Sequence, residues 1–207
     1  MKQSLLCVER LSRRFGDNEV FRSLDVKLEA GERLALVGPN GSGKTTLLRC
    51  IAGTIRPTTG RVLIAGYRAG TLGARSTTGA SLSQERSFYQ RLNGYANLVF
   101  FARLRRPNGE RPEAVVAAIV DELELAHIAA ERVDRCSSGM IQQLAFARAL
   151  LGDPELLLLD EPTRSMDAAA ARRLWGALDR RPQVAAVVAT HTPADLARCH
   201  GSLALPR

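Results

Sequence analysis

A glycine-rich segment in the first quarter of the chain has the residue types of a phosphate-binding loop. Its eight residues, Gly-Pro-Asn-Gly-Ser-Gly-Lys-Thr at positions 38–45, fit the pattern G-x-x-x-x-G-K-[ST] at every fixed position. Glycines let such a loop curl tightly and turn its N–H groups onto phosphate oxygens. We expect Lys44 to reach the β- and γ-phosphates of a nucleoside triphosphate and Thr45 to bind Mg²⁺. The residues expected to bind the nucleotide here are Gly38, Pro39, Asn40, Gly41, Ser42, Gly43, Lys44, Thr45 and Thr46.

Two acidic residues, Asp160 and Glu161, directly follow a run of four leucines that is typical of a buried strand. In open α/β sheets, ligands bind beyond the carboxyl ends of the strands. Asp160 is therefore expected to bind Mg²⁺, directly or through a water of the ion, and Glu161 to orient or deprotonate an attacking water. An alternative is that both acids only cap the next helix, and the phosphate-binding loop elsewhere in the chain disfavours it.

Short apolar runs alternate with helical patterns around both motifs. Strands are predicted over 4–10, 24–29, 32–37, 61–65, 79–83, 155–160 and 184–190, and helices over 43–52, 94–104, 113–125, 139–151, 168–179 and 193–199. The order predicts an α/β fold with a mostly parallel core sheet, an N-terminal antiparallel β layer and an inserted helical subdomain. We expect one domain, 1–207, with its core in 1–84 and 152–207 and the helical subdomain in 85–151. Residues 65–79, rich in Gly, Thr and Arg, are expected to form a loop.

The composition is that of a globular protein: of 207 residues, 45% are hydrophobic and 24% charged, which excludes a disordered chain. No apolar run approaches the roughly 18 residues of a membrane span. Glu9 and Arg10 interrupt the first apolar run, so no signal peptide is expected.

The four cysteines are scattered along the chain, a spacing that favours reduced thiols. The net charge of +8 permits nucleic-acid binding, but the arginines are spread along the chain, so no nucleic-acid partner is expected.

A third segment gives the two motifs a more specific meaning. Cys136-Ser137-Ser138-Gly139-Met140 would by itself predict only the N-terminus of a helix. The order of the motifs along the chain, however, resembles that of ATP-binding cassette (ABC) proteins. It runs through the phosphate-binding loop, Gln84, the C-S-S-G-M segment as the signature motif, L-L-L-L-D-E-P, Asp167 and His191.

The resemblance implies a P-loop NTPase fold of the ABC type and a role for each matching residue. Phe15 would stack on adenine. Gln84 would sense both Mg²⁺ and the lytic water, so it is expected to act both as a metal-binding and as a catalytic residue. His191 would contact the γ-phosphate beside Glu161. Asp167 is implied as the D-loop aspartate of the family, with a role in nucleotide binding.

The resemblance also implies a dimer, either of two copies or with a second ATP-binding subunit. Ser137 and Gly139 would face the γ-phosphate of an ATP bound to the other subunit. ATP and Mg²⁺ are the implied cofactors. The common signature is L-S-G-G-Q; the C-S-S-G-M variant resembles exporter subunits, so we expect export.

The implied activity is ATP hydrolysis that drives a separate transmembrane permease, with this chain held at the cytoplasmic face of the membrane. Residues 87–98 are expected to contact the permease, with Phe88, Tyr89 and Leu92 as apolar anchors. A soluble ABC-type ATPase acting on nucleic acid or ribosomes remains an alternative, favoured only by the net charge. A kinase is a third, but no motif marks an acceptor site.

Overall fold

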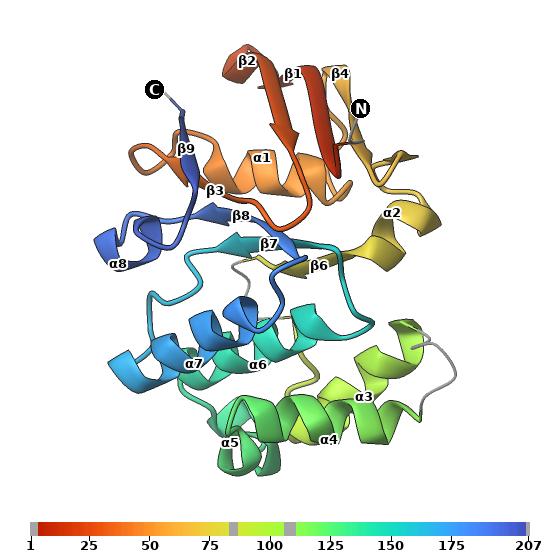
Figure 1. The fold of residues 1–207 in the computed structure, drawn as a ribbon, viewed down its shortest axis with the longest axis vertical. Helices are drawn as coiled ribbons and strands as arrows, with labels where there is room; N and C mark the ends of the chain where they lie inside the picture. Colours follow the sequence, from red (N-terminus) through yellow and green to blue (C-terminus); the bar gives the residue numbers. More distant parts are fainter. Residues whose placement is uncertain (1–3, 83–86, 106–110, 206–207) are drawn as a thin grey trace.

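The structure, a computed structural model, describes residues 4–82, 87–105 and 111–205. Figure 1 shows a small antiparallel sheet above a parallel sheet, with most of the helices gathered below the parallel sheet. The antiparallel sheet has the strand order β2-β1-β4-β5, and the parallel sheet has the order β6-β7-β8-β3-β9. The predicted α/β architecture is confirmed, including the antiparallel layer and the parallel core.

The antiparallel sheet is built around a long hairpin. Its strands are β1 (Leu6–Phe15), β2 (Asn18–Leu28), β4 (Thr59–Ile64) and β5 (Tyr67–Arg68). The buried residues of β1 are Leu6, Val8 and Leu11; Leu6 and Val8 alternate with the half-buried Cys7 and Glu9 before bulges shift the register. The prediction found only the apolar ends of this hairpin, at 4–10 and 24–29, because its tip is polar.

The parallel sheet consists of β3 (Arg33–Val37), β6 (Thr78–Ser81), β7 (Leu156–Asp160), β8 (Ala185–Ala189) and β9 (Gly201–Ala204). Every residue of β7 and β8 is buried, as expected for strands with packed elements on both faces. Leu156 and Leu158 belong to the hydrophobic cluster that includes α1 (Lys44–Ile51) and the antiparallel sheet. Leu157 and Leu159 belong to the cluster on the opposite face.

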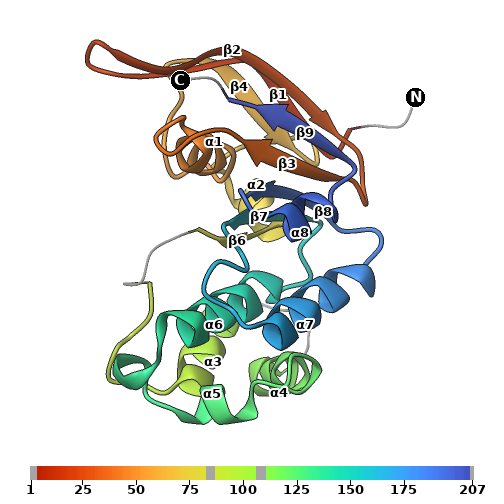
Figure 2. The same ribbon diagram turned by 90° about the vertical axis from the view of Figure 1, so that its left-hand side faces the viewer.

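That second cluster continues from the sheet into the helices. Figure 2 shows α6 (Ser138–Leu150) and α7 (Ala168–Asp179) below the sheet, and beneath them α3 (Gly94–Arg105), α4 (Pro112–Glu122) and α5 (Ala126–Ala130). One 3₁₀ turn, Val133–Arg135, precedes α6. The division into a core and a helical subdomain at 85–151 remains a prediction. No helix in the described part of the chain is long and apolar enough to span a bilayer.

Four short elements differ from the sequence prediction. Helix α2 (Leu72–Thr77) and β5 lie within residues 65–79, which were expected to form a loop. The Thr71 hydroxyl caps α2 by accepting from the Ala74 N–H at 3.4 Å. Strand β9 was not predicted, because its four residues carry little apolar pattern and it forms through pairing with β3. The remaining helix, α8 (Pro193–Leu196), is shorter than the predicted 193–199.

Candidate active site

The glycine-rich loop connects the buried strand β3 to α1, the context that a phosphate-binding loop requires. Gly41 and Gly43 have φ angles of +83° and +94°, in the region that favours glycine. A Cβ atom on Gly43 would also lie 2.5 Å from Cγ1 of Val20 on β2. Backbone conformation and the close approach of the hairpin therefore both require glycine at position 43.

The start of α1 offers hydrogen-bond donors suited to phosphate. No side chain caps the helix at Gly43, and the first N–H groups of a helix have no acceptors within it. Those groups also lie at the positive end of the helix dipole. The buried Ser42 hydroxyl has no hydrogen-bond partner among the described residues. An anion bound in this loop would satisfy these groups, so the loop fits a nucleotide phosphate.

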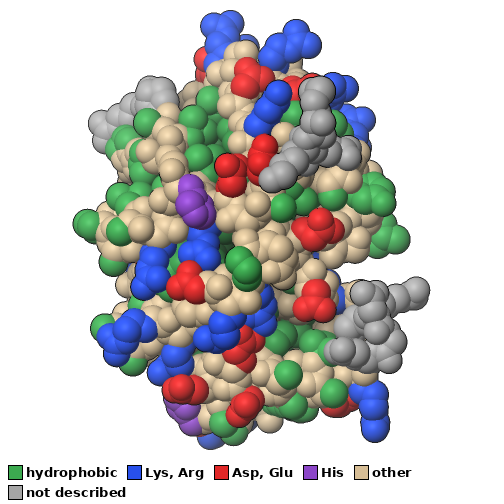
Figure 3. All heavy atoms as spheres, viewed as in Figure 1, with side chains coloured by type: hydrophobic (Ala, Val, Ile, Leu, Met, Phe, Trp, Pro, Cys, Tyr) green, Lys and Arg blue, Asp and Glu red, His purple; other side chains and the backbone are tan. Residues whose placement is uncertain are grey.

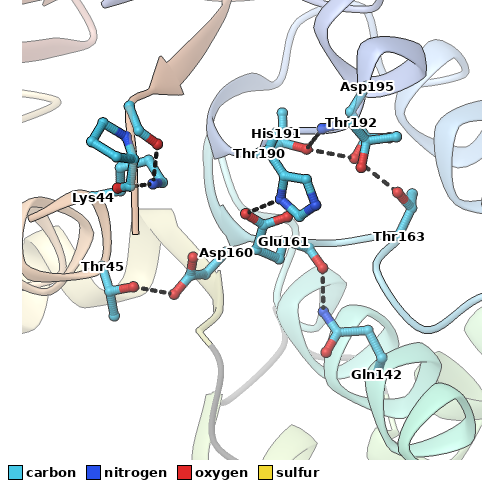
Figure 4. Close-up of polar contacts among 12 residues, drawn as sticks. Lys44, Thr45, Gln142, Asp160, Glu161, Thr163, Thr190, His191, Thr192 and Asp195 are labelled. Carbon is cyan, nitrogen blue, oxygen red and sulfur yellow. Dashed lines mark hydrogen bonds and ion pairs between the residues drawn. The ribbon is translucent and has the colours of Figure 1, made fainter. Parts of the chain in front are cut away.

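Lys44 is turned back across its own loop. Its Nζ atom donates to the carbonyl oxygens of Gly38 at 2.7 Å and Pro39 at 3.0 Å, and the residue is buried. Figure 4 shows these contacts beside Thr45 and the end of β7. The ammonium group is thus already held at the mouth of the loop, where it would exchange carbonyl oxygens for phosphate oxygens.

Thr45 and Asp160 bring two oxygen ligands together from segments far apart in the sequence. The Thr45 hydroxyl donates to Asp160 Oδ2 at 2.7 Å, and Asp160 is buried at the end of β7. Hydroxyl and carboxylate oxygens, together with phosphate oxygens, are the ligands that Mg²⁺ prefers. The pair therefore fits the predicted metal position.

Glu161 and His191 form a second pair at the same end of the parallel sheet. His191 Nδ1 lies 2.8 Å from Glu161 Oε1, and the Glu161 N–H donates to the carbonyl of Ala189 on β8 at 2.8 Å. Glu161 has a φ of +49°, a strained conformation for a non-glycine residue. Its Oε2 atom is buried and has no hydrogen-bond partner among the described residues. That free acceptor suits a carboxylate that would orient a water.

The segment at 136–140 begins α6, as predicted. Ser137 caps the helix by accepting from the Met140 N–H at 3.2 Å. Further along α6, Gln142 Nε2 donates to the carbonyl oxygen of Glu161 at 3.4 Å. The signature helix is therefore connected within one chain to the backbone of the predicted catalytic glutamate.

Comparison with known proteins identifies the family. The profile described as "ABC transporter" matches residues 21–164. This chain belongs to the ABC transporter family. The family match covers the loop, the signature and the acid pair of this ABC protein, in agreement with the resemblance stated from the motifs.

Curated relatives include the "Sulfate/thiosulfate import ATP-binding protein CysA" of Burkholderia mallei, 37% identical over 180 residues that cover 84% of this ABC protein and 51% of the relative. CysA of Escherichia coli K12 is 33% identical, with 81% and 47% covered. "Uncharacterized ABC transporter ATP-binding protein YdbJ" of Bacillus subtilis is 33% identical, with 83% and 55% covered. The ABC protein thus spans about half the length of the curated relatives it matches.

Solved structures agree with the fold. The dimeric ATP-binding cassette MJ0796, described as bound to ADP and Pi, superposes with a TM-score of 0.86 at 22% identity, covering 97% of this ABC protein and 94% of that chain. An "ATP binding subunit of ABC transporter" gives a TM-score of 0.86 at 25% identity, with 98% and 86% covered. These superpositions show that the ABC protein has the fold of an ABC ATPase.

Phe15 and Asp167, two further predicted site residues of the ABC protein, lie outside this group of contacts. Phe15 ends β1 at the hairpin tip, is 46% exposed, and has the Arg13 guanidinium 4.0 Å from its ring centre. Asp167 caps α7 by accepting from the Ala170 N–H at 2.8 Å, and this bond lowers the pKa of its carboxyl. Gln84 lies outside the described residues. The roles of these three residues toward the nucleotide remain predictions.

Polar residues that belong to none of the motifs support the site of this ABC protein. Gln142, Thr163, Thr190 and Asp195 contact Glu161 or the segments beside Glu161 and His191. One signal was available: Thr192-Pro193-Ala194-Asp195 follows β8 with the spacing of a helix-capping sequence. That pattern marks the helix start but not the partners, which come from distant parts of the chain.

Proposed function

We propose that this chain is the ATP-binding and ATP-hydrolysing subunit of an ABC transporter, working with Mg²⁺. The observation that carries the proposal is the meeting of two pairs at the carboxyl ends of the parallel strands. Thr45 Oγ1 lies 2.7 Å from Asp160 Oδ2 there, and His191 Nδ1 lies 2.8 Å from Glu161 Oε1. One pair supplies oxygen ligands and the other a carboxylate base with an imidazole partner.

Different residues of the chain would bind the phosphates, activate the water and position the catalytic carboxylate. The loop N–H groups and Lys44 bind the phosphates. Glu161 orients and deprotonates the water through its Oε2 atom, which has no hydrogen-bond partner in the described part of the chain. His191 holds Glu161 Oε1 in place and would contact the γ-phosphate. When bound, Mg²⁺ would neutralise charge on the phosphate oxygens.

We propose further that two ATP-binding subunits act as a dimer, with Ser137 and Gly139 of one facing the nucleotide of the other. Support comes from the N-terminus of α6, where Ser137 is the capping residue, and from the dimeric cassette MJ0796 with the same fold. The sharing of one triphosphate by two helix N-termini would make the dimer close on ATP binding and weaken on hydrolysis.

The proposed partner is a separate transmembrane permease, which would hold the subunit at the cytoplasmic face of a membrane. Tyr89, Leu92 and Phe100 are exposed, and the Tyr89 and Phe100 rings meet edge to face at 4.9 Å. Phe88, expected as a third anchor, is buried, with the Arg148 guanidinium 4.7 Å from its ring centre. The proposed contact surface is therefore Tyr89, Leu92 and Phe100.

The direction of transport has support on both sides. The resemblance of C-S-S-G-M to exporter signatures favours export, whereas the CysA relatives are named as import proteins. Inside-out vesicles that contain the complex would distinguish them: with ATP outside, an exporter concentrates its cargo in the lumen and an importer depletes the lumen.

Nucleic acid is not a proposed partner. On the face drawn in Figure 3, lysine and arginine side chains are interspersed with aspartate and glutamate among the described residues. Nucleic-acid-binding proteins instead gather basic side chains into a stripe. Recovery of the chain with ribosomes or DNA, and not with a polytopic membrane protein from detergent-solubilised membranes, would contradict the proposed partner.

The activity is tested with the catalytic glutamate. We expect Glu161→Gln to bind ATP, to lose turnover and to accumulate as an ATP-dependent dimer by light scattering. Glu155→Gln is the matched control, because Glu155 is exposed immediately before the same strand. A Glu161→Gln protein that stays monomeric at saturating ATP would contradict the two-chain site, and one that hydrolyses ATP normally would contradict the catalytic role.

A further inference from the structure

Asp195 is a buried carboxylate to which neither the motifs nor the proposed mechanism assigns a role. It lies in α8 and exposes 2% of its surface. Its Oδ1 atom accepts from Trp175 Nε1 at 2.9 Å, and its Oδ2 atom accepts from the hydroxyls of Thr163 at 2.8 Å and Thr190 at 3.0 Å. A carboxylate buried without donors would be costly, so these three donors stabilise Asp195 at its position.

Two of the donors come from the segments that carry the catalytic pair. Thr163 lies two residues after Glu161, and Thr190 immediately precedes His191. Figure 4 shows the Asp195 carboxylate between the two threonine hydroxyls. A single side chain therefore joins the segment after β7 to the end of β8.

The Thr190 hydroxyl extends this link to both sides of His191. It donates to Asp195 and accepts from the Thr192 N–H at 3.1 Å. The backbone before and after His191 is thus fixed to the same buried carboxylate. Because the imidazole itself is largely exposed, contacts of its backbone are needed to hold it at the 2.8 Å distance from Glu161.

Glu161 also needs support from its surroundings. Its φ of +49° is strained, and such conformations persist only where neighbouring contacts hold them. Contacts come from the Ala189 carbonyl on β8, from Gln142 on α6 and, through Thr163, from Asp195.

The third donor anchors the network to the core. Trp175 lies on α7, exposes 3% of its surface and packs in the cluster below the parallel sheet. Among the described residues, the three hydrogen-bond donors to the Asp195 carboxylate are all side chains outside α8, and the Thr192 N–H at the start of α8 donates to the Thr190 hydroxyl. The contacts of Asp195 are therefore directed to the catalytic segments and the core.

We propose that Asp195 is a positioning residue for ATP hydrolysis, which fixes the segments after β7 and β8 so that Glu161 and His191 stay paired. The inference rests on the proposed function of the chain as an ATPase. Misplacement of a catalytic group by about 1 Å costs on the order of 100-fold in rate, so cutting the network has a measurable effect on turnover.

The test compares variants that cut different arms of the network. Asp195→Asn, Thr163→Val and Thr190→Val remove links to the catalytic segments with little change in shape. Trp175→Phe is the matched control, because it removes only the bond to the core. We expect the first three to lower kcat by about 10-fold to 100-fold while the Kd for ATP changes less than about twofold. Trp175→Phe should lower Tm yet retain kcat.

Hydrogen exchange supplies a measurement that does not need activity. In Asp195→Asn, the Thr192 and Glu161 amides should exchange faster relative to those of α4. Unchanged kcat and unchanged exchange at these two amides would overturn the positioning role, as would a kcat loss in Trp175→Phe equal to that in Asp195→Asn. A wild-type protein without ATP hydrolysis would overturn the proposed function instead, and the exchange measurement would still decide what Asp195 holds.

Discussion

The backbone carbonyl oxygen of Ser165 approaches Gly139 so closely that a Cβ atom at position 139 would overlap it. Gly139 is buried in the first turn of α6, and Ser165 lies between Glu161 and the Asp167 cap of α7. The signature motif and the segment that follows the proposed catalytic glutamate are therefore in contact within one chain.

This contact predicts the effect of adding one methyl group. Gly139→Ala should force the Ser165 segment away from α6, at a cost of about 1–3 kcal/mol in the free energy of unfolding. We expect the variant to fold, to bind ATP and to lose ATP-dependent dimer formation and turnover. Urea denaturation, light scattering and an ATPase assay measure the three properties.

Ser138→Gly is the matched control for that variant. Ser138 is exposed beside Gly139, and glycine is the residue that the common ABC signature has at this position. We expect turnover at or above that of the wild type. Normal dimerisation of Gly139→Ala would show that the close approach to Ser165 has no part in the two-chain site.

Lys44 gives a second prediction, because its ammonium group already donates to Gly38 and Pro39. Lys44→Ala would remove a donor whose bonds to charged oxygens contribute about 1.5–3 kcal/mol each. The affinity for ATP should fall by about 10-fold to 100-fold, as measured by titration with a fluorescent ATP analogue. The control is Lys27→Ala on the exposed face of β2, and equal affinities for the two variants would disprove the role of Lys44.

His191 gives a third prediction, which separates binding from chemistry. His191→Ala leaves Glu161 Oε1 without its partner at 2.8 Å but removes a side chain that is 66% exposed. We expect stability and the Kd for ATP to change little and kcat to fall by about 100-fold. His127→Ala, an exposed substitution on α5, serves as the control. Retained turnover in His191→Ala would exclude a catalytic role for the imidazole.

The sequence predicted the groups that are proposed to bind the nucleotide better than the groups that support them. Lys44, Asp160 and His191 follow strands or loops with a distinct pattern, and the parallel sheet brings their segments to one edge. Asp195 was missed because its donors, Trp175 and Thr163, lie 20 and 32 residues away and no local pattern connects them.

The wrong prediction for Phe88 has a similar cause. Phe88 was expected to be an anchor for the permease because residues 87–98 follow Gln84 directly, yet its ring is buried against Arg148 of α6 and Phe101 of α3. Burial of Arg148 among these rings lowers its pKa to about 10, a consequence of packing that no local pattern predicts. Strand β9 likewise depends on its neighbour β3 for its hydrogen bonds.

The last prediction concerns acid stability and the pair that joins α4 to the end of α7. Both oxygens of Glu122 accept from Arg181 at 2.6 Å, and Arg180 adds a bond at 3.0 Å; these arginines, Arg181 first, lower the pKa of the Glu122 carboxyl. Because the pKa is lower in the folded than in the unfolded chain, the stabilisation is complete above about pH 4.3 and is lost as pH falls through the folded-state pKa.

Glu122→Gln should therefore reduce the free energy of unfolding by about 1 kcal/mol at pH 7, and the difference from wild type should shrink toward pH 3 in urea titrations. Glu113→Gln is the control on the same helix, since the exposed Glu113–Arg103 pair should contribute less. A Glu122→Gln difference that is constant from pH 7 to pH 3 would mean that the pair's charge does not stabilise the fold.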